Sequence, residues 1–275
     1  MPLYQAIVLA VVQGLTEFLP VSSTAHLDLF PWLLGWRDPG LTFDVALHAG
    51  TLFAVLLYFW RMWVEMLSAA AGFSGAGNPK SENRRLFWYL VIGTIPAGLA
   101  GYKFERAAEK TLRQPMVVGA ALILVALFMW AAERVSQRDE TLGQVTLLDS
   151  IFVGVSQAVA VIPGVSRSGI TMSTGLFRRM TRETSARFSF LLSTPIIAGA
   201  ALKKLVEIRH EGLAPEMRLP FVVGIVVSSL VGYAVIAWFI RYLERRTFKP
   251  FIVYRLALGA AVLVVYIWTH GILKA

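Results

Sequence analysis

The sequence predicts an all-α integral membrane protein built as an inverted-topology repeat, in which each half is a broken re-entrant helix pair plus three transmembrane helices. The first observation is composition: of 275 residues, 56% are hydrophobic and 16% charged, and the mean hydropathy is +0.63. Soluble domains carry about 25% charged residues. A water-soluble protein of this length needs more charged residues on its surface than this chain has. We therefore expect one polytopic membrane domain over residues 1–275.

The second observation is a set of six apolar runs, each near the length of about 20 residues that a helix needs to cross a bilayer. They lie between charged residues, at 42–60, 86–102, 114–132, 188–202, 219–240 and 256–273. Two further apolar stretches, 2–34 and 147–177, are interrupted near their middles by proline and serine. Because proline removes a backbone donor and serine favours helix caps, each stretch is predicted as two half-length helices joined by a polar turn.

The third observation is that the two broken stretches resemble each other. At an offset of 144 residues, Gln13 falls on Gln157 and Ser22 on Ser166. One broken pair followed by three spans occurs twice, which predicts internal repeats at about 1–135 and about 145–275. If each pair re-enters on its own side, each half crosses three times and the second half is inverted. Such repeats bring their interrupted helices together at a midplane site.

The net charge of +9 comes from 26 basic and 17 acidic residues, clustered between the apolar runs. This pattern favours anionic lipid or an anionic substrate, and we expect no nucleic acid as a partner. One face would carry 14 basic residues and the other 10. The positive-inside rule then places the first face, with the loop 61–85, in the cytoplasm and both chain termini outside.

The first break carries an amide and a carboxylate one helical turn apart. Gln13 and Glu17 share a helix face, and their oxygens could hold a divalent cation such as Mg²⁺ together with substrate phosphates. An ionisable residue inside a membrane indicates function by default. The alternative is a structural carboxylate that pairs with Arg167 and holds the two halves together.

Three hydroxyls and a histidine open the next half-helix. Ser22, Ser23 and Thr24 can cap backbone N–H groups, and the same helix N-terminus can bind an anion. His26 lies in the first turn, where it could act as general acid, general base or phosphate ligand. The alternative for His26 is a structural histidine.

The second break, at 163–169, has the composition of a phosphate cradle. Gly164 permits close backbone approach, Ser166 and Ser168 add hydroxyl donors, and Arg167 offers a planar fork for a phosphate. Together the two breaks suit phosphoryl transfer, in which positioning and charge stabilisation dominate. This interpretation requires Glu17 and Arg167 to lie close enough to reach one anion.

Four further ionisable residues lie near the ends of apolar segments: Asp28, Asp44, His48 and Arg255. We interpret them as interfacial or snorkelling side chains rather than as members of the site.

The two motifs resemble those of a known family. The run 13–26 (QGLTEFLPVSSTAH) and the run 163–171 (PGVSRSGIT) are similar to the motifs of the undecaprenyl-pyrophosphate phosphatases, the bacitracin-resistance proteins of bacteria. The resemblance extends over essentially the whole chain, including 188–192 and 254–255.

The resemblance implies a hydrolase of the bacterial inner membrane that removes the terminal phosphate of the C55 polyprenyl pyrophosphate at the periplasmic side. The product is the carrier lipid that is reused for peptidoglycan. The family needs a divalent cation, Mg²⁺ or Ca²⁺, and its acidic motif maps to Gln13 and Glu17, so a single carboxylate is available here. The assignments are catalytic residues Glu17, His26, Arg167 and Ser23; substrate-binding residues Ser22, Thr24, Gly164, Ser166, Ser168 and Thr171; and metal-binding residues Glu17 and Gln13.

Several alternatives stay open at this point. The nucleophile is Ser23, His26 or water. A transporter or lipid flippase could use the same inverted-repeat scaffold. A phosphatase of the phosphatidic-acid type is disfavoured, because the next histidine after Ser166 and Arg167, His210, lies in a predicted loop. The expected partners are the lipid substrate and membrane lipids, and a homodimer is left open.

Overall fold

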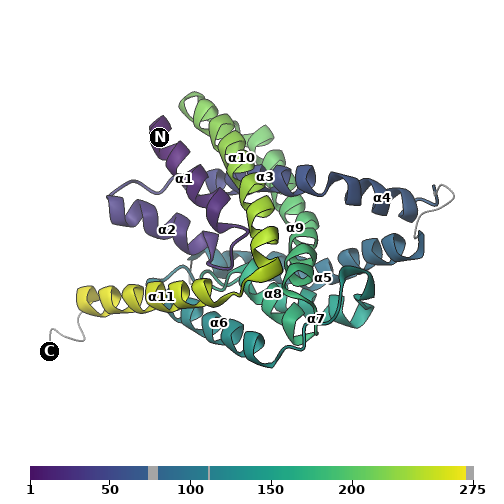
Figure 1. Cartoon of the computed structure of the whole chain (residues 1–275). Coiled ribbons are helices and arrows are strands. Elements are labelled where there is room, and N and C mark those ends of the chain that lie inside the picture. Colours follow the sequence, from purple (N-terminus) through teal and green to yellow (C-terminus); the bar gives the residue numbers. More distant parts are fainter. Residues whose placement is uncertain (74–79, 111, 271–275) are drawn as a thin grey trace.

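The structure, a computed structural model, describes residues 1–73, 80–110 and 112–270. Within these ranges the chain is helical, and its only bridge of the β type is an isolated one between Glu140 and Met180. The elements are α1 (Leu3–Thr16), α2 (Ser23–Leu34), α3 (Leu41–Tyr58), α4 (Trp60–Ala70), α5 (Lys80–Lys110), α6 (Pro115–Val135), η1 (Leu142–Gln144), α7 (Leu147–Val159), α8 (Arg167–Phe177), α9 (Arg182–Glu211), α10 (Pro215–Arg245) and α11 (Lys249–His270). The predicted all-α fold class is confirmed (Figure 1).

Both predicted helix breaks are present. The stretch 2–34 divides into α1 and α2, and the stretch 147–177 divides into α7 and α8. Ser22 caps α2 and Ser166 caps α8, and each hydroxyl accepts a hydrogen bond from the backbone N–H three residues further on. The serines predicted as caps therefore begin the second helix of each pair.

Five helices in the described part of the chain are long and apolar enough to cross a membrane, namely α3, α6, α9, α10 and α11. They correspond to five of the six predicted spans, and residues 271–273 of the last one lie outside the described residues. The sixth, 86–102, lies within α5, which is not among these five, and its role as a span stays a prediction. The loop predicted at 61–85 is wrong at both ends, because helix α4 extends to Ala70 and helix α5 already begins at Lys80. Met66 and Ala69, one turn apart, bury one side of α4. Residues 74–79 of that loop lie outside the described residues.

Helices from the two halves of the chain pack against each other. Helices α1 and α3 lie on α10, α7 lies on α5, and α11 lies on α6 (Figure 1). Small residues permit the close approach: a Cβ at Gly154 of α7 would lie 2.2 Å from the carbonyl oxygen of Gly93 in α5. The pairs α1–α10 and α7–α5 are the ones that a repeat would exchange, while the inverted sense of the two halves stays a prediction.

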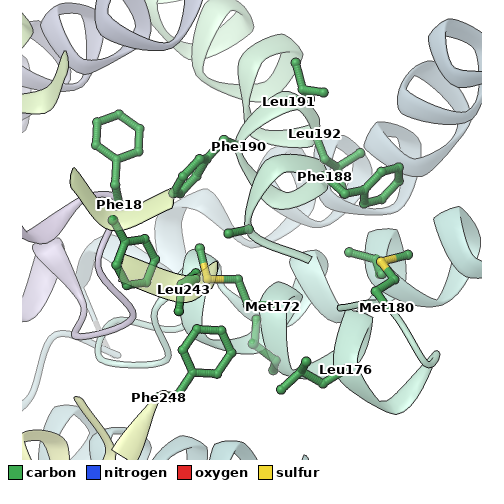
Figure 2. Close-up of a cluster of buried hydrophobic side chains, with 14 of the residues drawn as sticks. Phe18, Met172, Leu176, Met180, Phe188, Phe190, Leu191, Leu192, Leu243 and Phe248 are labelled. Atoms are coloured by element: carbon green, nitrogen blue, oxygen red, sulfur yellow. The ribbon is translucent and has the colours of Figure 1, made fainter. Parts of the chain in front are cut away.

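The core lies beside the two breaks. Phe18, directly after Glu17, makes an edge-to-face contact with Phe190 of α9 at a centroid distance of 5.2 Å. Met172 of α8 and Phe248, before α11, belong to the same buried cluster (Figure 2). Aromatic packing therefore fixes the backbone on both sides of the functional groups.

The outer faces of the long helices are apolar. Leu57, Leu124, Leu230 and Val264, from four different helices, are each at least 59% exposed. Soluble proteins rarely expose extended apolar surface, whereas a lipid-facing helix requires it. The chain is a multi-pass membrane protein.

Candidate functional site

The two breaks meet. The Arg167 guanidinium donates from Nη2 to Glu17 Oε1 at 2.7 Å, and the Ser168 hydroxyl donates to the carbonyl of Leu19 at 3.0 Å. The requirement that Glu17 and Arg167 reach one anion is met. The ion pair that we considered as a structural alternative also forms, so it can hold the halves together when no substrate is bound.

The two turns have closely similar backbones. Ser22 has φ 77° and ψ 94°, and Ser166 has φ 68° and ψ 107°. A side chain other than glycine rarely adopts positive φ, and such strain concentrates at functional sites. Each serine hydroxyl also lies near the hydroxyl two residues on, that of Thr24 at 3.2 Å and that of Ser168 at 3.3 Å. The N-termini of α2 and α8, each with a pair of hydroxyls, therefore lie next to each other, and this arrangement is suited to binding an anion.

Polar groups surround the Glu17 carboxylate, which is 7% exposed. Its Oε2 accepts hydrogen bonds from Ser23 Oγ at 2.6 Å and from Gln13 Nε2 at 3.1 Å. His48 Nε2 lies 3.4 Å from the same oxygen. The interfacial interpretation of His48 missed this contact, because only the packing of α3 beside α1 brings the two residues together.

Arg255 is fully buried, so its interpretation as an interfacial side chain is wrong. At distances of 2.9 to 3.4 Å its guanidinium donates to five backbone carbonyls, those of Pro20, Ala121, Leu122, Gly164 and Val165. One side chain thus ties both turns to α6. The presence of an arginine within an apolar segment was the available signal, but nothing in the sequence identifies backbone carbonyls as its partners.

His26 lies apart from the Glu17 cluster. Its Nδ1 donates to the carbonyl of Ser22 at 2.7 Å, and its Nε2 lies 2.7 Å from the hydroxyl of Tyr254. The two rings are also stacked. Both ring nitrogens therefore have partners, and His26 is not among the residues that line the cavity described below. Its catalytic role stays a prediction.

Two predicted substrate-binding residues, Gly164 and Thr171, are also not among the residues that line the cavity. Thr171 Oγ1 donates to the carbonyl of Arg167 at 2.7 Å. Gly164 has φ 90°, and a Cβ there would lie 2.6 Å from the carbonyl oxygen of Val118 in α6. The absence of a side chain at Gly164 therefore lets the backbone approach helix α6 closely. Asp28 and Asp44 lie outside the cavity as well and pair with Arg113 at 3.3 and 3.1 Å.

A cavity of about 240 Å³ opens where the breaks meet. Its polar lining contains seven of the predicted site residues: Glu17, Ser22, Ser23, Thr24, Ser166, Arg167 and Ser168. His48 and Gln157 complete the polar lining, and small and branched apolar residues of α5, α7 and α9 form the rest.

The oxygen and nitrogen atoms of the side chains near Glu17 could serve as ligands of a divalent cation. No three His, Cys, Asp or Glu side chains cluster as a metal site within the described residues. Mg²⁺, however, is usually held by one or two carboxylates plus substrate phosphates. The Gln13 Oε1 atom is buried beside the carboxylate and has no hydrogen-bond partner among the described residues. Gln13, Glu17 and His48 therefore form the set of side chains that could hold a cation here.

The fold and this cavity together define a polytopic membrane protein with a candidate anion site where two interrupted helices meet. The family model described as "Bacitracin resistance protein BacA" matches residues 6–261. The chain belongs to this family, as its motifs predicted.

Several similar proteins share the name undecaprenyl-diphosphatase. The protein from Moorella thermoacetica is 50% identical over 266 residues, which cover 97% of this chain and 98% of that protein. The protein from Desulforudis audaxviator is 47% identical over 95% of this chain and 97% of its own length. The protein from Pelotomaculum thermopropionicum is 45% identical over 96% of this chain and 97% of its own length.

Proposed function

We propose that this chain is an undecaprenyl-diphosphatase, which hydrolyses undecaprenyl pyrophosphate to undecaprenyl phosphate and inorganic phosphate. The reaction recycles the carrier lipid for peptidoglycan synthesis and accounts for the family's association with bacitracin resistance. The observation that carries the proposal is the contact between Arg167 and Glu17 in a cavity lined by hydroxyls from two helix N-termini. This arrangement provides positive charge and donors for a pyrophosphate inside an apolar protein.

The terminal phosphate binds between the two turns. Arg167 donates to its oxygens, and the hydroxyls of Ser22, Thr24, Ser166 and Ser168 add further donors. Because Arg167 Nη1 also donates to the carbonyl of Ser189 at 3.3 Å, its guanidinium is held in place before substrate arrives. Such preorganised charge stabilises the transition state more than the ground state.

Ser23 is the nucleophile in this proposal. Its hydroxyl lines the cavity and already donates to Glu17 Oε2 at 2.6 Å. The serine oxygen bonds to the terminal phosphorus, its proton passes to Glu17, and the bond from that phosphorus to the bridging oxygen breaks. Undecaprenyl phosphate leaves, and water then hydrolyses the phosphoserine to release inorganic phosphate. His26 is a weaker candidate, because both of its ring nitrogens already have partners and it is not among the residues that line the cavity.

A divalent cation, Mg²⁺ or Ca²⁺, would be held by Glu17 and Gln13, with His48 as an added ligand. When bound, it would neutralise charge on the pyrophosphate. The buried, unpartnered Oε1 of Gln13 supports this assignment.

We further propose that the protein lies in the bacterial inner membrane with its cavity open to the periplasm. The uneven distribution of basic residues between the two faces supports this orientation. A homodimer stays a prediction.

Phosphate release in detergent tests the proposed function. Purified protein with Mg²⁺ and undecaprenyl pyrophosphate should release inorganic phosphate, and micelles have no compartments, so this release cannot be transport. Glu17→Ala and Arg167→Ala should lower the rate by at least about 10²-fold while eluting as folded protein. His210→Ala, at an exposed position in the last turn of α9, serves as the control.

The competing function is lipid flipping. A folded wild-type protein that releases no phosphate would contradict the phosphatase. Transfer of a labelled polyprenyl phosphate between the leaflets of liposomes would then support the flippase.

A further inference from the structure

A buried amide of the second half of the chain lines the cavity without a partner. Gln157 of α7 is 3% exposed, and neither its Oε1 nor its Nε2 has a hydrogen-bond partner among the described residues. A buried amide that forms no hydrogen bond is costly, so groups of this kind are almost always satisfied by protein, water or ligand. A ligand in the cavity is therefore the natural partner of Gln157.

The comparison with the first half explains why this amide is free. Gln13, at the equivalent position, donates to Glu17 one helical turn later. One turn after Gln157 the chain has Val161, which offers no acceptor. The second half thus has an apolar residue at the position equivalent to Glu17. The Gln157 amide can therefore bind a group that enters the cavity.

The surroundings of Gln157 indicate which part of the substrate it meets. The apolar part of the wall comes from α5, α9, the end of α7 and the two residues that follow α7, and it includes Gly101, Val161 and Ile196. A Cβ at Gly101 would meet no atom within 4 Å, so this side has open space. The charged and hydroxylic groups come from the two turns instead. A molecule with a pyrophosphate at one end and a prenyl chain at the other matches this division.

We propose that Gln157 binds the lipid-side phosphate of the substrate, the one that stays on the polyprenyl product. The inference rests on the proposed function and adds the direction in which the substrate lies. The terminal phosphate is held by Arg167 and the hydroxyls. The amide Nε2 of Gln157 donates to the second phosphate, at the start of the apolar wall.

Product inhibition tests the assignment, because the two products carry the two phosphates separately. In Gln157→Met, which keeps the side-chain length and removes the amide, the inhibition constant of polyprenyl phosphate should rise about tenfold, as expected for one lost hydrogen bond to a charged group. The inhibition constant of inorganic phosphate should stay within about twofold. Gln144→Met, at an exposed position in η1, should change neither value.

Two results would overturn the proposal: a rise for inorganic phosphate instead, or no change for either product. If Gln157→Met does not fold, Gln157→Asn shortens the side chain by one carbon and should weaken polyprenyl phosphate selectively as well. Direct binding of polyprenyl phosphate, measured by native mass spectrometry, gives a readout without turnover. Weaker binding in the variant would support the role of Gln157 even if the wild type released no phosphate, and unchanged binding would contradict it.

Discussion

Arg167 and Ser23 occupy equivalent positions, 144 residues apart, in the two turns and bond to opposite oxygens of one carboxylate. The guanidinium reaches Glu17 Oε1 at 2.7 Å and the hydroxyl reaches Oε2 at 2.6 Å. The second half has Val161 where the first has Glu17. The two turns therefore supply different chemistry to one site, and neither half could form it alone.

Glu17 and Arg167 should behave as one unit in catalysis. We expect Glu17→Gln and Arg167→Lys each to lower kcat/KM by at least about 10²-fold, and the double variant to fall no more than about tenfold below the weaker single variant. The reason is that either single substitution already breaks the contact between Glu17 and Arg167, so substituting the second residue removes little further catalysis. Phosphate release from the four proteins in detergent gives the cycle. Fully multiplicative losses would show that the two residues act independently.

Ser23 should carry phosphate during turnover. Acid quenching in the presence of substrate, followed by peptide mass spectrometry, should locate a phosphoserine at Ser23, because its hydroxyl faces the cavity beside a carboxylate acceptor. Ser22→Ala should keep this modification, whereas Ser23→Ala should lose it. Phosphohistidine at His26 would contradict the assignment, and the absence of any phosphorylated residue would favour direct attack by water.

His48 should contribute to metal affinity in the absence of substrate. Imidazole suits transition metals better than Mg²⁺, so His48→Ala should weaken Mn²⁺ binding by about tenfold and Mg²⁺ binding by less. Titration of the purified protein with Mn²⁺, followed by electron paramagnetic resonance, measures the affinity. His210→Ala is the matched control, and an unchanged Mn²⁺ affinity in His48→Ala would remove His48 from the ligand set.

Arg255 should stabilise the site through its five carbonyl contacts. Lysine cannot span them, and each buried carbonyl left without a donor costs roughly 1–3 kcal/mol. Arg255→Lys should therefore lower stability by about 2–4 kcal/mol, which a drop in Tm in detergent would reveal. Arg241→Lys, at an exposed position in α10, should leave Tm unchanged. An equal Tm for Arg255→Lys would show that other contacts hold the turns.

Local pattern was sufficient to predict most of the helices. Apolar runs bounded by charges predicted the five helices that are long and apolar enough to span a membrane, and proline with serine marked both breaks, because these signals act within a few residues of backbone. The helix α4 was missed, since its 11 residues are too few to span a membrane and were therefore assigned to a connecting loop. The grouping of Glu17 with the second motif was also predictable, because isolated charges in apolar sequence need partners.

The amino-acid pattern alone established the membrane class, the two broken helix pairs and the family, and it named seven of the residues that line the cavity. Residue contacts came only from the three-dimensional packing: His48 faces Glu17, His26 contacts Tyr254, Arg255 is fully buried, and Gln157 lines the cavity with no hydrogen-bond partner among the described residues. The physical reason is that helix periodicity fixes which face a residue occupies, whereas the neighbour of that face depends on how helices distant in the chain pack.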